Sequence, residues 1–207
     1  MRHLKMSIFL GFILATTSVW GQTDPFQIRE SDWVRGDKDA PVTLLEYSDF
    51  TCGFCEKFFR DTWPHLLSNY INTGKVRFVY RDFPRNVRGP GVDTALAAHC
   101  AGEQGRYWDM HDLLFSSKNK YGAGPLEQQA EQLGLDKDTF SQCFQSGRYL
   151  DVIFQGLQEG GSLGIRGTPG FVLYLSDNRD GSSRLLIPGA FPYEIFKEQI
   201  DRLLEQS

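Results

Sequence analysis

The chain has 207 residues, of which 41% are hydrophobic and 14% are aromatic. This composition suits a packed globular core and excludes a disordered chain. The net charge is −4 at pH 7 and the sequence has no basic run, so we expect no nucleic-acid partner.

Residues 1–21 have the features of a secretory signal peptide. Arg2 and Lys5 form a positive n-region, and Ile8–Ala15 forms an apolar h-region. Small residues suit cleavage near Gly21. The h-region is short for a bilayer span, and an uncleaved anchor is the alternative interpretation. We therefore expect an exported protein that works in the periplasm.

The next segments predict a strand, a helix and a second strand. Residues 22–40 are polar and mixed, which indicates an arm with at most one short strand. Val42–Tyr47 and Val76–Tyr80 are rich in β-formers and predict two strands, which should lie parallel. Between them we expect a helix over residues 52–72, with a kink at Pro64.

From residue 92 to about residue 161 the pattern is helical. Strands return at Phe171–Leu175 and Arg184–Ile187, and the turn residues Asp177–Gly181 join them into a hairpin. A last amphipathic helix covers Tyr193–Glu205. The helices predicted within the central block are Asp93–Glu103, Tyr107–Ser116, Leu126–Leu133, Lys137–Gln145 and Leu150–Glu159.

This order of elements predicts an α/β protein with a mixed central sheet flanked by helices. A helical subdomain is inserted in the middle of the chain. We assign residues 22–91 and 162–207 to the sheet domain and residues 92–161 to the inserted subdomain.

The four cysteines are Cys52, Cys55, Cys100 and Cys143. Disulfides persist in an exported compartment, and four cysteines allow three pairings. The closeness of Cys52 and Cys55 favours their mutual pairing, which leaves Cys100 with Cys143 as a structural disulfide. The alternative for the second pair is two buried free thiols.

The motif Cys52-Gly53-Phe54-Cys55 stands where a strand passes into a helix, and this position predicts a redox centre. The first turn of a helix offers free N–H groups and partial positive charge, which would hold Cys52 as a reactive thiolate. Cys55, one turn along, would resolve a mixed disulfide. Gly53 leaves the sulfur approachable, and Phe54 adds apolar surface for a substrate.

A bare Cys-x-x-Cys also fits two other kinds of site. Half a zinc site would need further ligands, and the candidates His99, Cys100, His111 and Cys143 lack the usual spacing. A purely structural disulfide would not need a strand-to-helix junction. We therefore expect no metal, and no cofactor other than the redox-active disulfide.

Two further positions favour redox chemistry. Glu46 precedes Cys52 on the predicted strand, where burying an acid is costly, and it could exchange a proton with Cys55. The alternative is an outward-facing Glu46. Thr168-Pro169 lies in a glycine-rich loop before a strand, which favours a cis peptide and a site for a substrate strand. An ordinary trans proline is the alternative.

Together these residues resemble the thioredoxin superfamily and, within it, the DsbA-like thiol:disulfide oxidoreductases. The resemblance extends from about Asp39 to the C-terminal helix and implies a thioredoxin-like fold with an inserted helical subdomain. It rests on Glu46, the cysteine motif, Pro64, Thr168-Pro169 and the stretches "DAPVTLLEYSDFTCGFC", "AAHCAGEQGRYWDMHDLLF" and "LGIRGTPGFVLY".

The resemblance implies a periplasmic protein that donates its disulfide to unfolded or reduced exported proteins. Cys52 would be the nucleophile, Cys55 the buried resolving thiol, and Glu46 the residue that shuttles the proton. Pro169 would be cis, with Thr168 pairing to the substrate backbone. A membrane quinone-linked partner, DsbB-like or vitamin-K-epoxide-reductase-like, would reoxidise the pair.

Gly53-Phe54 stands where the best-known DsbA has Pro-His. We therefore expect a reduction potential between about −120 mV, the value for DsbA, and about −270 mV, the value for thioredoxin. Thr168 before the proline also resembles disulfide isomerases, but residues 22–41 are too few for their dimerisation domain. We favour a monomeric oxidase; the alternatives are a reductase or isomerase of the same fold and a metal-binding chaperone module.

Overall fold

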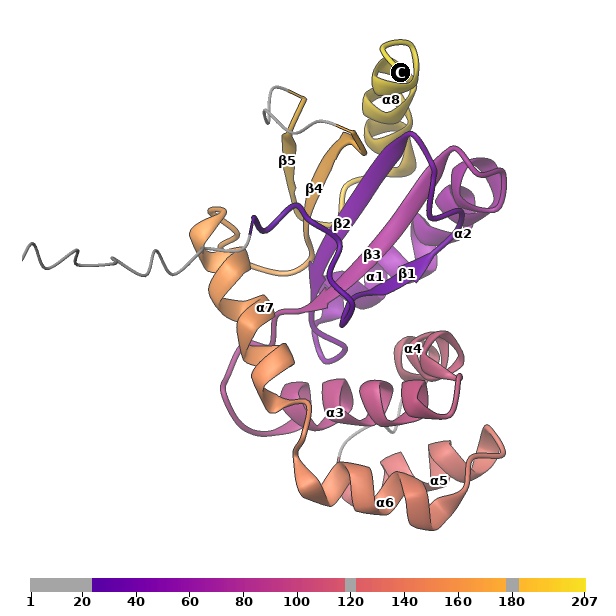
Figure 1. The fold of residues 1–207 in the computed structure, drawn as a ribbon, viewed down its shortest axis with the longest axis vertical. Coiled ribbons are helices and arrows are strands. Elements are labelled where there is room, and N and C mark those ends of the chain that lie inside the picture. Colours follow the sequence, from indigo (N-terminus) through magenta and orange to yellow (C-terminus); the bar gives the residue numbers. More distant parts are fainter. Residues whose placement is uncertain (1–23, 118–121, 178–182) are drawn as a thin grey trace, which may run out of the picture.

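The structure is a computed structural model that describes residues 24–117, 122–177 and 183–207. The predicted signal peptide and most of the predicted turn at 177–181 lie outside these residues. Within them, a five-stranded mixed sheet forms the centre of the molecule (Figure 1). Its strands are β1 (Trp33–Arg35), β2 (Val42–Ser48), β3 (Val76–Asp82), β4 (Gly170–Leu175) and β5 (Leu185–Pro188).

The strands follow the order β1-β3-β2-β4-β5 across the sheet. β2 and β3 are parallel, as predicted, and the other pairs are antiparallel. The helical elements match the predicted positions closely. They are α1 (Gly53–Asp61), α2 (Trp63–Leu66), the π-helical turn η1 (Leu67–Ile71), α3 (Pro90–Glu103), α4 (Tyr107–Ser116), α5 (Ala123–Gln132), α6 (Lys137–Ser146), α7 (Leu150–Ser162) and α8 (Tyr193–Leu204).

The segment 52–72 differs from the single kinked helix that the sequence predicted. It is divided at Thr62, and Pro64 lies in the first turn of the following helix. A proline lacks an N–H, and its ring crowds the carbonyl four residues earlier, here that of Arg60, so the helix must end before it. In the first turn of a helix the missing N–H costs nothing. The π-helical turn that follows was not predicted.

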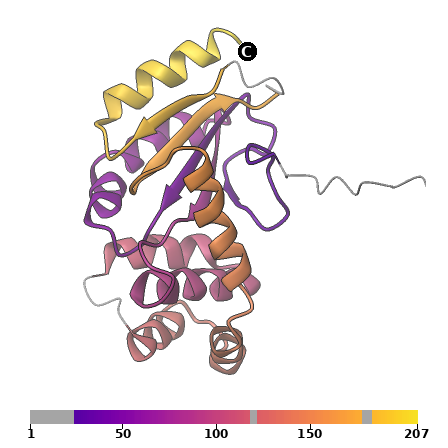
Figure 2. The same cartoon turned by 90° about the vertical axis from the view of Figure 1, so that its left-hand side faces the viewer.

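Side chains from the two faces of the sheet enter separate apolar clusters. Leu44 of β2 packs in the cluster that includes Phe58 of α1 and Phe196 of α8. Leu45, one residue along, enters the opposite cluster, because successive strand residues point to opposite faces. α8 lies along one face, as both views show (Figures 1 and 2). β2 is buried throughout, which explains its continuous apolar run.

Helix α7 packs closely against the end of β3. A Cβ atom on Gly156 would lie 2.4 Å from the carbonyl oxygen of Asp82, and one on Gly160 would lie 2.6 Å from the Phe83 ring. The glycines therefore allow the helix to approach the backbone of the sheet. α7 contacts both β3 and α3, so it connects the helical region to the sheet. The domain boundaries at 92 and 161 remain predictions.

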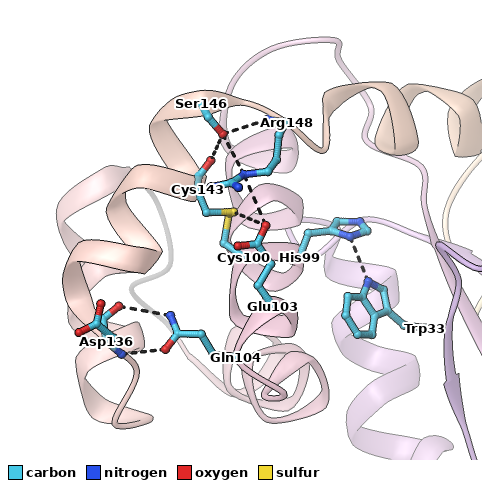
Figure 3. Close-up of a disulfide and its surroundings, with 9 residues drawn as sticks. All are labelled: Trp33, His99, Cys100, Glu103, Gln104, Asp136, Cys143, Ser146 and Arg148. Carbon is cyan, nitrogen blue, oxygen red and sulfur yellow. Dashed lines mark hydrogen bonds and ion pairs between the residues drawn. A yellow bond between two sulfur atoms is a disulfide. The ribbon is translucent and has the colours of Figure 1, made fainter.

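Helices α3 to α6 lie beyond one end of the sheet (Figures 1 and 2). A disulfide joins Cys100 of α3 to Cys143 of α6 across 43 positions (Figure 3). Beside it, the Trp33 indole N–H donates to His99 Nδ1 at 3.0 Å. An indole only donates, so the His99 proton is on Nε2, 2.8 Å from Asp82 Oδ2. These contacts attach the helices to β1 and β3.

Candidate active site

The Cys52-Gly53-Phe54-Cys55 motif lies at the start of α1. Cys52 occupies the N-cap position with extended backbone angles, and its carbonyl accepts the Glu56 N–H at 3.0 Å. Cys52 is half-buried, whereas Cys55 is fully buried on the inner side of the helix. Both are free thiols in this structure. The half-buried sulfur of Cys52 is therefore the one that another molecule can reach.

The surroundings of Cys52 favour its thiolate. A hydrogen bond from the Cys55 thiol is the largest influence, and it lowers the pKa of Cys52 from its usual value to about 5. Burial opposes this shift, while the Thr168 side chain and the backbone N–H groups of Cys55 and Phe54 add to it. These N–H groups belong to the first turn of α1, where no intrahelical acceptor exists. At neutral pH the Cys52 sulfur is thus ionised, which is the form in which a thiol acts as a nucleophile.

Cys55 is in the opposite electrostatic situation. Burial is the main cause that raises its pKa far above that of an ordinary thiol, and nearby Glu46 and Cys52 raise it further. A thiolate at Cys55 would be buried away from water and close to Cys52 and Glu46. The Cys55 sulfur must therefore take up a proton as soon as it gains negative charge. Exchange at this pair therefore needs a proton donor at Cys55.

Glu46 is buried on β2, and its side chain lies on the face of the sheet against which Cys55 packs. Burial raises the pKa of Glu46 to about 8, and the charge of Cys52 adds to this shift. The carboxyl is therefore protonated at neutral pH and can serve as the donor. The outward-facing alternative does not apply, since the side chain is 2% exposed.

Ser48 is a site residue that the sequence analysis did not identify. It is buried two positions after Glu46 on the same face of β2, and its hydroxyl lowers the pKa of both Glu46 and Cys55. The alternation of strand residues was the signal that could have placed it there.

The loop before β4 closes the site. β2 and β4 are antiparallel with Tyr47 opposite Gly170, so the end of one strand meets the start of the other. The Thr168–Pro169 peptide bond in this loop is cis. The Cys52 thiol lies 3.3 Å from the Thr168 carbonyl oxygen, to which it donates when protonated.

An apolar groove of about 560 Å³ begins at this loop. Phe54, Leu186 and Phe191 line it and are 68%, 41% and 40% exposed, unusually high values for such side chains. A Cβ on Gly53 would meet no atom within 4 Å, so the approach to the neighbouring sulfur is open. Of these three residues only Phe54 was predicted from the sequence, because apolar residues near a strand, such as Leu186 and Phe191, resemble core residues.

The other two cysteines and the two central histidines have partners of their own. Cys100 and Cys143 are bonded to each other, while His99 and His111 are buried among aromatic rings. Among residues 24–117, 122–177 and 183–207, no three His, Cys, Asp or Glu side chains are placed to hold a metal ion. No helix in the described part of the chain is long and apolar enough to cross a membrane.

Comparison with known proteins identifies related chains. A family model described as "Thioredoxin" matches residues 29–175. The crystal structure of alpha-DsbA1 from Wolbachia pipientis is 28% identical, with a TM-score of 0.78 over 86% of this chain and 94% of that one. This chain is therefore similar in fold to nearly the whole of that Wolbachia protein.

Two curated relatives are longer than this chain. The Na(+)/H(+) antiporter NhaA 3 of Salinispora tropica is 34% identical over 143 residues, which are 69% of this chain and 21% of that protein. A Rickettsia bellii protein named "Putative protein-disulfide oxidoreductase" is 30% identical over 133 residues, 62% of this chain and 51% of that one. The chain thus spans about a fifth to about half of these relatives, and their names describe the longer proteins.

Proposed function

Because the chain belongs to the thioredoxin family, among its DsbA-like thiol:disulfide oxidoreductases, we propose that it oxidises the thiols of exported proteins. The contrast between the two thiols of the motif is the observation that carries this proposal. Cys52 is half-buried with a pKa of about 5, while burial raises the pKa of Cys55. A stabilised thiolate favours the reduced form, and this makes the Cys52–Cys55 disulfide a stronger oxidant.

The exchange passes through a mixed disulfide. A client thiolate attacks Cys52 Sγ, the bond to Cys55 breaks, and its electron pair leaves on the Cys55 sulfur. A second client thiolate then attacks the client sulfur of the mixed disulfide and releases Cys52 as a thiolate. The client gains a disulfide, and the two electrons remain on the reduced cysteine pair.

Glu46 supplies the proton in the first step. The leaving Cys55 sulfur is buried and unfavourable as a thiolate, and the protonated Glu46 carboxyl lies near it. Glu46 gives its proton as the sulfur takes up the electron pair. In the reduced protein Glu46 regains a proton from solvent at neutral pH, because its pKa is about 8. During reoxidation the ionised fraction of Glu46 accepts the Cys55 proton when Cys55 attacks. Ser48 is buried close to both groups, and its hydroxyl lowers the pKa of each.

The groove beside the motif suits an unfolded client segment. Its exposed apolar side chains would bury those of the client, which become accessible only when the client is unfolded. The loop at Thr168 and Pro169 offers backbone groups to an extended chain, as in strand addition. We therefore assign substrate binding to this loop together with Gly53 and Phe54.

We place the protein in the periplasm, where such clients emerge. The signal-peptide pattern of residues 1–21 supports this location. The proposed cycle leaves two electrons on the cysteines and therefore requires a reoxidant. We propose a membrane quinone-linked protein of the DsbB or vitamin-K-epoxide-reductase type for that role, and a monomeric state for this chain.

Equilibration of the purified protein with reduced and oxidised glutathione tests the direction of electron flow. We expect a potential above about −250 mV, within the interval from about −120 to about −270 mV that DsbA and thioredoxin bound. A value below about −250 mV would contradict the oxidase and support a reductase. Refolding of a client with scrambled disulfides distinguishes an isomerase, which would restore activity without any net oxidation.

A further inference from the structure

A second pocket adjoins Cys52, and the reaction described above does not use it. Its volume is about 280 Å³, and its lining shares no residue with the apolar groove. We name it the arginine pocket after Arg85 and Arg88, which line it together with Cys52 and Gly53. Cys52 therefore lines the arginine pocket, while the apolar groove begins at Thr168, whose carbonyl oxygen lies 3.3 Å from the Cys52 sulfur.

Positive charge dominates the arginine pocket. Arg85 and Arg88 are both exposed, and within the described residues neither guanidinium has an ion pair or a hydrogen bond. The pocket also includes Gly53 and Pro90, the first residues of α1 and α3. Helix N-termini carry partial positive charge, so two dipoles add to the two arginines.

The one acidic side chain in the lining, Asp49, offsets only part of the charge of the two arginines. Asp49 is 5% exposed, and Thr51 donates to its Oδ1 through the backbone N–H at 2.8 Å and the hydroxyl at 2.7 Å. The Oδ2 atom of Asp49 accepts a hydrogen bond from the backbone N–H of Arg85 at 3.1 Å. The carboxylate is thus occupied in holding the Arg85 loop to the active-site loop. Glu56 and Asp93, in the first turns of the two helices, do not line the pocket.

We propose that the arginine pocket binds an acidic side chain of the client, close in sequence to the client cysteine that reacts with Cys52. This inference rests on the proposed function and defines its substrate class. A client segment joined to Cys52 would extend into the apolar groove on one side and towards Arg85 and Arg88 on the other. Attraction between opposite charges would speed the encounter, although the chain as a whole carries a net charge of −4.

The test measures oxidation of short dithiol peptides by the oxidised mature protein. In the first set, three peptides differ only in the two residues that precede the first cysteine, which are both glutamate, both glutamine or both lysine. In the second set, the same pairs of residues follow that cysteine. We expect the glutamate peptide of one set to react about tenfold faster than its glutamine counterpart at low salt. The lysine peptide should be slowest, and high salt should reduce the differences.

The double variant Arg85→Gln/Arg88→Gln should bring the glutamate-to-glutamine rate ratio close to one. The control Arg106→Gln/Arg202→Gln removes the same charge from exposed positions elsewhere and should keep the ratio. An unchanged ratio in the first variant, or no preference in the unmodified protein, overturns the pocket assignment. Failure to oxidise even the glutamine peptide would instead reject the proposed function.

Reduced glutathione decides between a peptide and a small anionic thiol as the occupant. It carries carboxylates of the same chemistry on a small molecule. If its rate falls as much as that of the glutamate peptide in the double variant, the pocket serves small thiols, and the assignment to clients is wrong. We expect the glutathione rate to fall much less. Glutathione lacks the segment that the apolar groove would hold, so it is not directed into the arginine pocket as a client peptide is.

Discussion

The sulfur of Cys52 lies 3.3 Å from the carbonyl oxygen of Thr168, a residue 116 positions later in the chain. This contact stabilises the protonated thiol, since a carbonyl only accepts hydrogen bonds. The Cys55 thiol stabilises the thiolate most, and the Thr168 side chain and the first-turn N–H groups add to it, so together they outweigh burial and the pKa of Cys52 falls to about 5. The loop before β4 thus acts on this sulfur in two ways, since the Thr168 carbonyl accepts from the thiol while the Thr168 side chain favours the thiolate.

Cys55→Ala should raise the pKa of Cys52, because it removes the hydrogen bond that lowers this pKa most. Cys55→Ser is the matched control, since its hydroxyl still donates and should keep the pKa closer to that of the unmodified protein. Thiolate absorbance in the ultraviolet, recorded against pH, measures both. Equal midpoints in the two variants would contradict the assigned role of the Cys55 thiol.

Glu46→Gln should stabilise the reduced protein at alkaline pH. The unfolded chain loses the Glu46 proton near pH 4.5, whereas the folded protein keeps it to about pH 8. Within that interval the folded state binds more protons, so ionisation of Glu46 lowers the free energy of unfolding as pH rises, by at most about 1.4 kcal/mol per pH unit.

Urea denaturation under reducing conditions tests this pH dependence. The stability gained by Glu46→Gln should be absent below pH 4.5, grow with pH and level off near pH 8. Cys52 has the opposite dependence, since its lowered pKa stabilises the folded state as pH rises above about 5. The comparison is therefore between variant and parent at each pH. Glu198→Gln, exposed on α8, is the control for the removal of an acidic side chain.

The double variant Cys100→Ala/Cys143→Ala should lose about 4 kcal/mol of stability. The disulfide spans 43 positions, and the chain-entropy estimate for a loop of this length gives that value. Denaturation of both proteins without reductant measures the difference, and a strong reductant should remove it. A loss below 1 kcal/mol would show that the packing of α3 on α6 already supplies the constraint.

Gly156→Ala should destabilise the fold by about 3 kcal/mol or more. Its Cβ would lie 2.4 Å from a backbone oxygen of Asp82, so α7 would have to move away from β3. Gly161→Ala is the control on the same helix, because a Cβ there meets nothing within 4 Å. It should be neutral or gain up to about 1 kcal/mol from helix propensity. Thermal denaturation of both variants distinguishes the steric clash expected at Gly156 from a general effect of replacing a glycine in α7.

Local patterns in the sequence predicted most of the fold. β-formers at 42–47 and 76–80 and the amphipathic stretches between residues 93 and 205 lie where the structure has strands and helices. The division at Thr62 was not predicted, because a proline can either kink a helix or end it. The π-helical turn was not predicted either. The packing of α7 on Asp82 also depends on contact between distant segments.

The sequence alone determined the chemistry available to this protein: two cysteines at the start of a helix, an acid on the preceding strand and a Thr-Pro loop before a later strand. Only the tertiary structure decided how these groups act on one another. The register of β2 on β4 brings Thr168 to Cys52, and burial beneath α1 raises the pKa of Glu46 to about 8. Residue type and spacing are local properties, whereas burial and electrostatic coupling arise only when distant segments exclude water together.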